Sequence, residues 1–254
     1  MKPDWKPLDE ELARWHDNGL RLRLWWRDDD AISVTPALNR LAALATRLGL
    51  PVHLAVIPAL VRPDLADWAA SHPQIVPVVH GWAHENHAPA SEKKAEFRLH
   101  RPVEDIEADA RAGLARMSEV FGPAVRPMFV PPWNRIAPEV VQTLPALGYR
   151  VLSTATPRKT PLAAPGLEQV NTHLDPIDWR GSRSAIDPQR LIRQITGQLA
   201  DRRQGDADND EPYGILTHHL VHDEAIWTVV EALMERLTSA PYHPWTVERK
   251  EDRQ

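Results

Sequence analysis

The chain has 254 residues, of which 43% are hydrophobic and 26% are charged, a profile typical of a globular protein with a sizeable core. Its formal net charge of −5 argues against nucleic acid or an anionic membrane as the main partner. The absence of cysteine excludes disulfides, thiolate nucleophiles and thiolate zinc sites, so His, Asp and Glu remain as candidate metal ligands.

The amino-terminal stretch MKPDWKPLDEELARWHDNG has neither the apolar core nor the small-residue cleavage site of a signal peptide. No apolar run approaches the length that crosses a bilayer. We therefore expect a soluble, cytoplasmic protein without a membrane partner. The sequence leaves the oligomeric state open.

Short β-branched runs alternate with longer amphipathic segments along the whole chain. Strands are predicted at residues 21–26, 52–57, 75–80, 126–131, 150–155, 168–173 and 213–218. Helices are predicted at residues 35–49, 63–72, 102–122, 137–148, 187–203 and 223–237. Two of these helices begin with a capping residue followed by proline, at Thr35-Pro36 and Asp187-Pro188. The alternation predicts a parallel sheet, either a barrel or a doubly wound sheet, in one domain that spans residues 1–254.

Polar and titratable side chains follow five of the seven predicted strands. Functional side chains of a parallel barrel gather at the carboxyl ends of its strands, so we expect these clusters to form one site. The clusters are Arg27 to Asp30 after the first strand, His80, His84 and His87 after the third, Pro131 to Arg135 after the fourth, Asp175, Asp178 and Trp179 after the sixth, and His218, His219, His222 and Asp223 after the seventh.

The histidines after the third strand and the acidic triplet at residues 28–30 together suggest a metal site. Three adjacent carboxylates repel one another, which favours a hydrated turn unless a divalent cation lies nearby. His80 and His84 with one aspartate would form a facial ligand set with open positions for water. His87 and His100 are expected to be ordinary surface histidines.

The last cluster has two interpretations. His218 ends a predicted strand, and an imidazole at that position suits proton transfer at neutral pH. Its spacing to His222 also fits a second pair of metal ligands. In the simpler alternative, His222 and Asp223 cap the final helix.

The order of these motifs along most of the chain resembles that of the polysaccharide deacetylases, the NodB-type carbohydrate esterases. Their motifs are an aspartate pair after a strand, an H-x-x-x-H, a proline-rich turn with an aromatic residue, a D-x-x-D-W and a strand that ends L-x-H. The matching residues here are Asp29 and Asp30 in WRDDDA, His80 and His84, the segment FVPPWNR, then Asp175, Asp178 and Trp179, and last His218.

The resemblance implies an α/β fold, a single distorted (β/α)7 TIM-like barrel, and metal-dependent removal of an acetyl or other acyl group from an N-acylated sugar or related amide. It implies that Asp29 is the general base and that His218 is the general acid, oriented or tuned by Asp178. The implied ligands of zinc or a similar divalent ion are Asp30, His80 and His84.

Five residues near these motifs are expected to contact the sugar. They are Trp82, Trp133, Asn134, Arg135 and Trp179. Tryptophan rings offer flat apolar walls to a sugar ring, and core packing beneath the loops is the alternative for all three.

Two departures from the family pattern leave alternatives open. The third motif of the family begins with an arginine that pairs with the base carboxylate, and Val130 stands in its place, with Arg27 or Arg135 as candidate substitutes. A sugar-binding barrel that retains the metal without turnover is therefore one rival function. A metallohydrolase with a His218–His222 metal pair is another. In the first motif, Asp28-Asp29 is the alternative pair.

Overall fold

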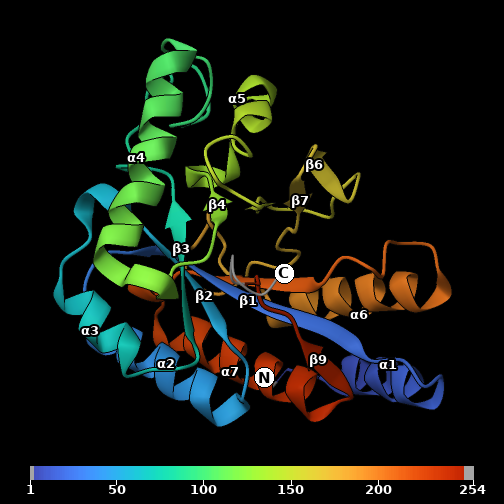
Figure 1. Cartoon of the computed structure of the whole chain (residues 1–254). Helices are drawn as coiled ribbons and strands as arrows, with labels where there is room; N and C mark the ends of the chain where they lie inside the picture. Colours follow the sequence, from blue (N-terminus) through green and yellow to red (C-terminus); the bar gives the residue numbers. More distant parts are fainter. Residues whose placement is uncertain (1–2, 249–254) are drawn as a thin grey trace.

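The computed structural model describes residues 3–248, which form a nine-stranded sheet with helices around it (Figure 1). The strands are β1 (Leu22–Ala31), β2 (Val52–Val56), β3 (Ile75–His80), β4 (Met128–Val130), β5 (Val151–Leu152), β6 (Leu162–Ala164), β7 (Leu167–Gln169), β8 (Tyr213–Thr217) and β9 (Tyr242–Pro244). Their order in the sheet is β6-β7-β5-β4-β3-β2-β1-β8, and β9 pairs with β1. All ladders are parallel except that of β6 with β7.

The helices cover the outside of this sheet. They are α1 (Lys6–Asp17), α2 (Pro36–Leu48), α3 (Asp64–Ala70), α4 (Val103–Phe121), α5 (Pro138–Thr143), α6 (Pro188–Gln204) and α7 (Glu224–Ser239). The predicted caps are confirmed, because the side chains of Thr35 and Asp187 accept hydrogen bonds from backbone N–H groups at 3.0 and 2.7 Å. No helix within residues 3–248 is long and apolar enough to cross a bilayer.

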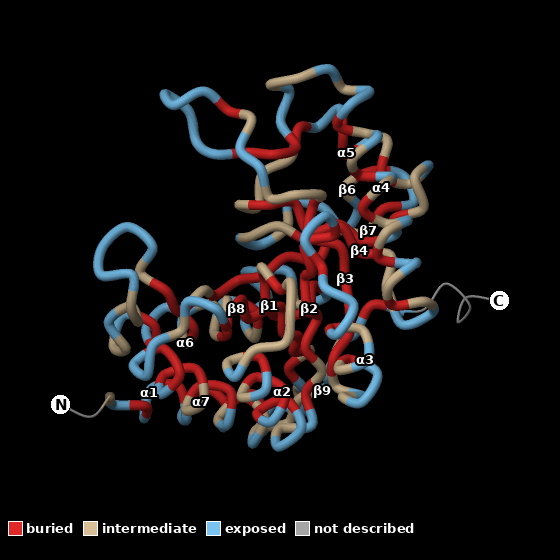
Figure 2. The backbone as a smooth tube through the Cα atoms, turned by 90° about the vertical axis from the view of Figure 1, so that its left-hand side faces the viewer, coloured by how far each residue is buried: buried red, intermediate tan, exposed pale blue. Residues whose placement is uncertain are grey.

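The predicted α/β architecture is confirmed as a curled, mostly parallel sheet, whose ladders among the described residues do not close into a ring. Beyond β7 the chain makes isolated parallel bridges, first between Thr172 and Ala155 and then between Leu174 and Ile215. These bridges span the gap between β5 and β8 in place of a continuous ladder. Buried residues concentrate in the central strands and on the inner sides of the helices (Figure 2), as expected for parallel strands covered on both faces.

Three of the labelled helices and strands lie outside the sequence predictions: α1, β6 and β9. In α1 the buried residues Leu8, Leu12 and Trp15 recur at helical spacing and form one face. Trp15 Nε1 donates to the carbonyl of Leu199 at 3.2 Å, so this face packs on α6. The acidic triplet also differs from expectation, because residues 28–30 belong to β1 itself and do not follow it.

Candidate metal and catalytic site

Three potential metal ligands converge at the carboxyl ends of β1 and β3. Asp30 Oδ1 lies 3.0 Å from His80 Nε2 and 3.3 Å from His84 Nε2. All three donor atoms lie within 4.8 Å of one another, and no other group of this kind occurs among residues 3–248. The backbone is left-handed at Asp30 and His84, with φ of 74° and 58°, a strained conformation that non-glycine residues adopt mainly where the surrounding structure imposes it.

A bulge in β1 brings both Asp29 and Asp30 to this site. Side chains alternate between the two faces of a regular strand, so adjacent residues point apart. The register of β1 with β2 shifts between Asp28 and Ala31, at the left-handed Asp30.

Asp28 is the member of the triplet that faces away from the metal ligands. Its buried carboxylate accepts from Thr217 Oγ1 at 2.6 Å and forms an ion pair with His219. Burial opposes the charge of Asp28, but His219 holds the pKa of this carboxyl below its ordinary value. The structure therefore places the pair Asp29-Asp30 at the site and gives Asp28 a buried ion pair behind it.

His80 is oriented by a backbone carbonyl. Its Nδ1 donates to the Val130 carbonyl at 3.0 Å, which turns Nε2 toward Asp30. Burial opposes the charge of His80, yet the carboxylates of Asp29 and Asp30 raise its pKa overall. In the same way, burial opposes the charge of Asp30, but His80 holds its pKa well below the ordinary range.

This donor set fits a divalent metal. Zinc bonds to imidazole nitrogen and carboxylate oxygen are about 2.0–2.2 Å long, so neighbouring ligand atoms in a tetrahedral site lie about 3.3 Å apart. The contacts of Asp30 with His80 and His84, at 3.0 and 3.3 Å, are of that size. Two imidazoles and one carboxylate leave room for water or substrate on the ion, as in hydrolytic metal sites.

The loop that carries His84 is shaped by Gly81 and Glu96. Gly81 has a φ of 59°, and a Cβ there would lie 2.3 Å from Glu96 Oε2 and 2.5 Å from Pro132 Cδ. The buried carboxylate of Glu96 accepts three backbone N–H groups within residues 82–85, at 2.8 to 3.4 Å. These contacts fold the loop so that His84 returns to His80. No sequence pattern pointed to Glu96.

Asp29 is buried beside the candidate metal ligands and is paired with Arg27. The two guanidinium nitrogens Nε and Nη2 lie 2.9 and 3.0 Å from the two carboxylate oxygens. Arg27 is fully buried and also donates to Ser153 Oγ at 2.8 Å and to Asn134 Oδ1 at 2.7 Å. The arginine that pairs with Asp29 therefore comes from β1, two residues before it. Arg135, the other candidate, donates to the carbonyl of Lys94.

His218 follows β8 and lies across the site from the candidate metal ligands. Its Nε2 is 4.0 Å from Asp29 Oδ2, and its ring packs edge-on against Trp179 at 4.8 Å between centroids. Asp175 accepts from Trp179 Nε1 at 2.7 Å. Burial raises the pKa of Asp175, and the charge of His218 acts against that rise. The indole of Trp179 therefore lies between Asp175 and the ring of His218.

Asp178, the residue predicted to orient His218, lies in a turn. Its oxygens accept from the backbone N–H groups of Gly181 and Ser182, both at 3.1 Å. These bonds, first that from Ser182, lower the pKa of Asp178. Both oxygens of Asp178 thus close this turn, whereas Asp175 is the member of the motif that bonds to Trp179 beside His218.

His222 does not form a metal pair with His218. Its Nε2 accepts the backbone N–H of His218 at 3.3 Å, and its ring packs against Trp227 at 4.6 Å. Burial lowers the pKa of His222 to about 4, so the ring is neutral at pH 7. Asp223 caps α7 by accepting the N–H of Ile226 at 2.8 Å, as the simpler alternative expects.

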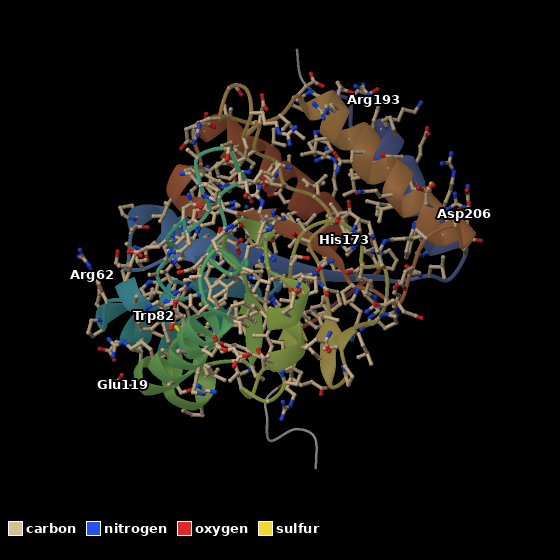
Figure 3. The ribbon with its side chains drawn as sticks, turned by 90° about the horizontal axis from the view of Figure 1, so that it is seen from above. Arg62, Trp82, Glu119, His173, Arg193 and Asp206 are labelled. Carbon is tan, nitrogen blue, oxygen red and sulfur yellow. The ribbon has the colours of Figure 1, made fainter. Side chains whose placement is uncertain are left out.

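The residues expected to contact a sugar differ in where they lie. The ring of Trp133 lies 4.3 Å from that of His84, and Trp179 is 39% exposed beside His218, so these two indoles flank the site. The side chain of Asn134 is held by its hydrogen bond from Arg27. Trp82 is half-buried and packs against the hydrophobic core (Figure 3), as the core-packing alternative expects.

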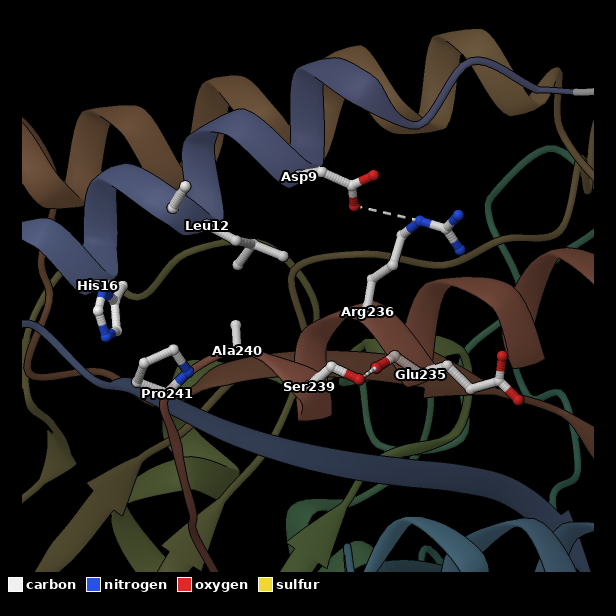
Figure 4. Close-up of a pocket in the computed structure, with 9 residues that line it drawn as sticks. Asp9, Leu12, His16, Glu235, Arg236, Ser239, Ala240 and Pro241 are labelled. Carbon is white, nitrogen blue, oxygen red and sulfur yellow. Dashed lines mark hydrogen bonds and ion pairs between the residues drawn. The ribbon is translucent and has the colours of Figure 1, made fainter.

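A separate hollow of about 430 Å³ lies between α1 and α7 (Figure 4). An ion pair between Asp9 and Arg236, at 3.3 Å, crosses its upper edge. None of the residues that line it belongs to the site around Asp30, so this hollow is separate from the candidate metal and catalytic residues.

Solved structures of deacetylases and esterases share this fold, although no family model and no curated protein matches the sequence. A peptidoglycan N-acetylglucosamine deacetylase superimposes with a TM-score of 0.58 at 13% identity, over 90% of this chain and 91% of its own. A family 4 carbohydrate esterase from Streptomyces lividans, solved with acetate, gives 0.54 at 12% identity over 89% and 93%. A family 4 acetyl xylan esterase from Clostridium thermocellum, solved with a cobalt ion, gives 0.51 at 14% identity over 88% and 87%. The chain therefore has the fold of the polysaccharide deacetylases and related esterases that its motifs resemble.

Proposed function

We propose that the protein is a metal-dependent hydrolase that removes an acetyl or other acyl group from an N-acylated sugar or a related amide. The observation that carries this proposal is the convergence of Asp30, His80 and His84 beside the buried Asp29, with His218 across from them. The fold supports it, because its structural neighbours include a peptidoglycan N-acetylglucosamine deacetylase and a cobalt-bound acetyl xylan esterase.

Asp30, His80 and His84 would hold the metal, for which zinc is our first candidate. Such an ion supplies Lewis acidity toward the acyl carbonyl and lowers the pKa of water at the site. The hydrogen bond from His80 Nδ1 to the Val130 carbonyl keeps Nε2 directed at the ligand position.

Asp29 is the proposed general base. Its carboxylate takes a proton from the attacking water as the oxygen bonds to the acyl carbon. The two-pronged contact with Arg27 balances the buried charge and fixes the orientation of the carboxylate. Pairing from within β1 removes the main reason to regard the protein as a non-catalytic sugar-binding barrel.

His218 is the proposed general acid. Its Nε2 gives a proton to the leaving nitrogen as the carbon–nitrogen bond breaks. The Trp179 ring, which donates to Asp175, packs edge-on against the imidazole and holds it in place. Trp133 and Trp179 would form the walls against which the sugar ring lies.

The test is acetate release from N-acetylglucosamine and its short oligomers by protein loaded with zinc, cobalt or manganese. We expect Asp29→Asn and His218→Ala to retain the metal and to lower kcat by about 10²–10⁴-fold. Asp175→Asn should lower kcat as well, whereas the matched control Asp178→Asn should not. Stoichiometric metal without release of any acyl group would instead favour the sugar-binding barrel.

A further inference from the structure

A positively charged pocket borders the candidate site. It has a volume of about 450 Å³, and its lining includes residues of α5, β5, β6 and β7. Four cationic side chains line it, and none of its lining residues is acidic. The four are Arg98, Arg135, Arg158 and Lys159. A hollow of this size accommodates a sugar-sized molecule.

Three of these cations have no carboxylate partner among the residues that the structure describes. Arg158 is paired with Asp208 at 2.7 Å. No ion pair joins Arg98, Arg135 or Lys159 to a carboxylate anywhere within residues 3–248. Burial and then repulsion from Arg98 lower the pKa of Arg135, so these two guanidinium groups already act on each other. A bound anion would offset this repulsion.

The pocket shares residues with the network around the proposed general base. Asn134 and Thr154 line it, and both accept hydrogen bonds from Arg27, through Asn134 Oδ1 at 2.7 Å and the Thr154 carbonyl at 3.2 Å. Arg27 in turn holds Asp29. The lining of the pocket is therefore joined to Asp29 through a single residue, Arg27.

Polar groups complete the pocket without adding negative side chains. The amide side chains of Gln169 and Asn171 line one side of it. The carbonyl of Lys94 accepts a hydrogen bond from Arg135, and its ammonium lies 5.9 Å from the ring centre of Trp133. The formal net charge of the chain is −5, so this local excess of cations runs against the overall charge.

We propose that the substrate is an acylated amino sugar that carries an anionic group, either a carboxylate or a phosphate, and that Arg98, Arg135 and Lys159 bind this group. This proposal rests on the deacetylase function proposed above. It narrows the substrate class, because a neutral acylated sugar would leave the pocket cations unpaired.

The first experiment compares kcat/KM of the zinc-loaded protein for three substrates: N-acetylglucosamine, N-acetylglucosamine 6-phosphate and N-acetylmuramic acid. We expect at least one anionic sugar to exceed the neutral sugar by about tenfold or more, since a hydrogen bond to a charged group contributes about 1.4 kcal/mol or more. The preferred anionic sugar distinguishes phosphate from carboxylate. Added salt should reduce the preference. Equal kcat/KM for all three would overturn the proposal.

The second experiment uses the double variant Arg98→Gln, Arg135→Gln. It should reduce kcat/KM for the anionic sugar about tenfold more than for the neutral one. The matched control is Arg193→Gln, an exposed arginine on α6 outside the pocket (Figure 3), which should leave the ratio of the two values unchanged. An unaltered ratio in a double variant with normal thermal unfolding would contradict the proposal.

A binding measurement separates this inference from the proposed reaction. Calorimetry with metal-loaded Asp29→Asn protein measures the affinity for each sugar without turnover. Weaker binding of the anionic sugar after loss of Arg98 and Arg135 would support the pocket even if no acetate is released from any substrate. If the affinity for the anionic sugar does not change, the pocket does not bind the anionic group, whatever the activity shows.

Discussion

Replacing Arg27 with methionine would leave the Asp29 carboxylate buried without its charged partner. The guanidinium of Arg27 is fully buried and contacts both oxygens of Asp29, at 2.9 and 3.0 Å. It also donates to Ser153 and Asn134, which hold it in place. Methionine matches much of the length of arginine but donates no hydrogen bond, so the variant removes the pair while filling most of the space.

The expected loss of stability is large. Removing one partner of a buried ion pair costs about 3–5 kcal/mol, because the remaining charge stays buried and unpaired. The matched control is Arg116→Met, since Arg116 pairs with the exposed Glu119 at 2.7 Å on the surface of α4. Surface pairs of this kind contribute about 0–1 kcal/mol. Urea unfolding of both variants measures the difference.

Activity gives a second measure of the same contact. Misplacing a catalytic group by about 1 Å costs on the order of 10²-fold in rate, so Arg27→Met should lower kcat by about that factor while the metal content stays stoichiometric. Arg27→Lys keeps the charge but not the two-pronged geometry, so its kcat should lie between that of the wild type and that of Arg27→Met.

A double-mutant cycle with Asp29→Asn decides whether the cost arises from this pair. Once Asp29 carries no charge, removal of Arg27 should destabilise the protein by much less than in the wild type. The reasoning would be refuted if Arg27→Met cost the same free energy of unfolding in both backgrounds, or if it left kcat unchanged.

Three further predictions concern the metal loop and the core. His84→Ala should lose bound metal in elemental analysis while His87→Ala, from the same loop, keeps it; equal metal content in the two would count against the ligand set. Gly81→Ala should weaken metal affinity and lower the unfolding temperature, because the added Cβ would collide with neighbouring atoms and the backbone there has a positive φ. Wild-type metal affinity and unfolding temperature in this variant would show that Gly81 is not needed to shape the loop. Burial lowers the pKa of His53 to about 4, whereas the same group has a pKa of about 6.5 in the unfolded chain. The neutral ring therefore favours the folded state above pH 6.5, and this contribution to stability is lost as the pH falls toward 4. Between pH 7 and 4 the wild type should therefore lose about 3 kcal/mol more of its unfolding free energy than His53→Gln, and parallel curves would show the expectation to be wrong.

The sequence predicted the order of most elements because their patterns are local. Alternating β-branched runs and capped amphipathic segments report directly on strands and helices, as the side-chain caps at Thr35 and Asp187 illustrate. The short strand β9 has three residues and includes Pro244, so it offers no such pattern. Its pairing with β1 depends on the rest of the fold.

The candidate site was predictable in outline but not in its partners. The spacing of His80 and His84 and their place after a strand pointed to convergence with an aspartate. Sequence alone does not show which carboxylate of a closely spaced set faces the site. That orientation depends on backbone conformation, here on the bulge at Asp30 and on the turn closed by Asp178.

The replacement for the motif arginine shows the same limit. Arg27 and Arg135 were equally possible from the sequence, because either lies near a predicted strand end. Arg27 is directed at Asp29 by Ser153 and Asn134, which come from loops more than a hundred residues away. Contacts of this range follow from the packing of β1 against the strands around it and leave no trace in a local motif.

An anomalous-difference map from crystals of the zinc-loaded protein tests the central claim most directly. We expect one strong peak about 2.0–2.2 Å from Asp30 Oδ1, His80 Nε2 and His84 Nε2, with Asp29 and Arg27 beside it. A zinc ion bound instead by His218 and His222, or no peak between β1 and β3, would contradict it.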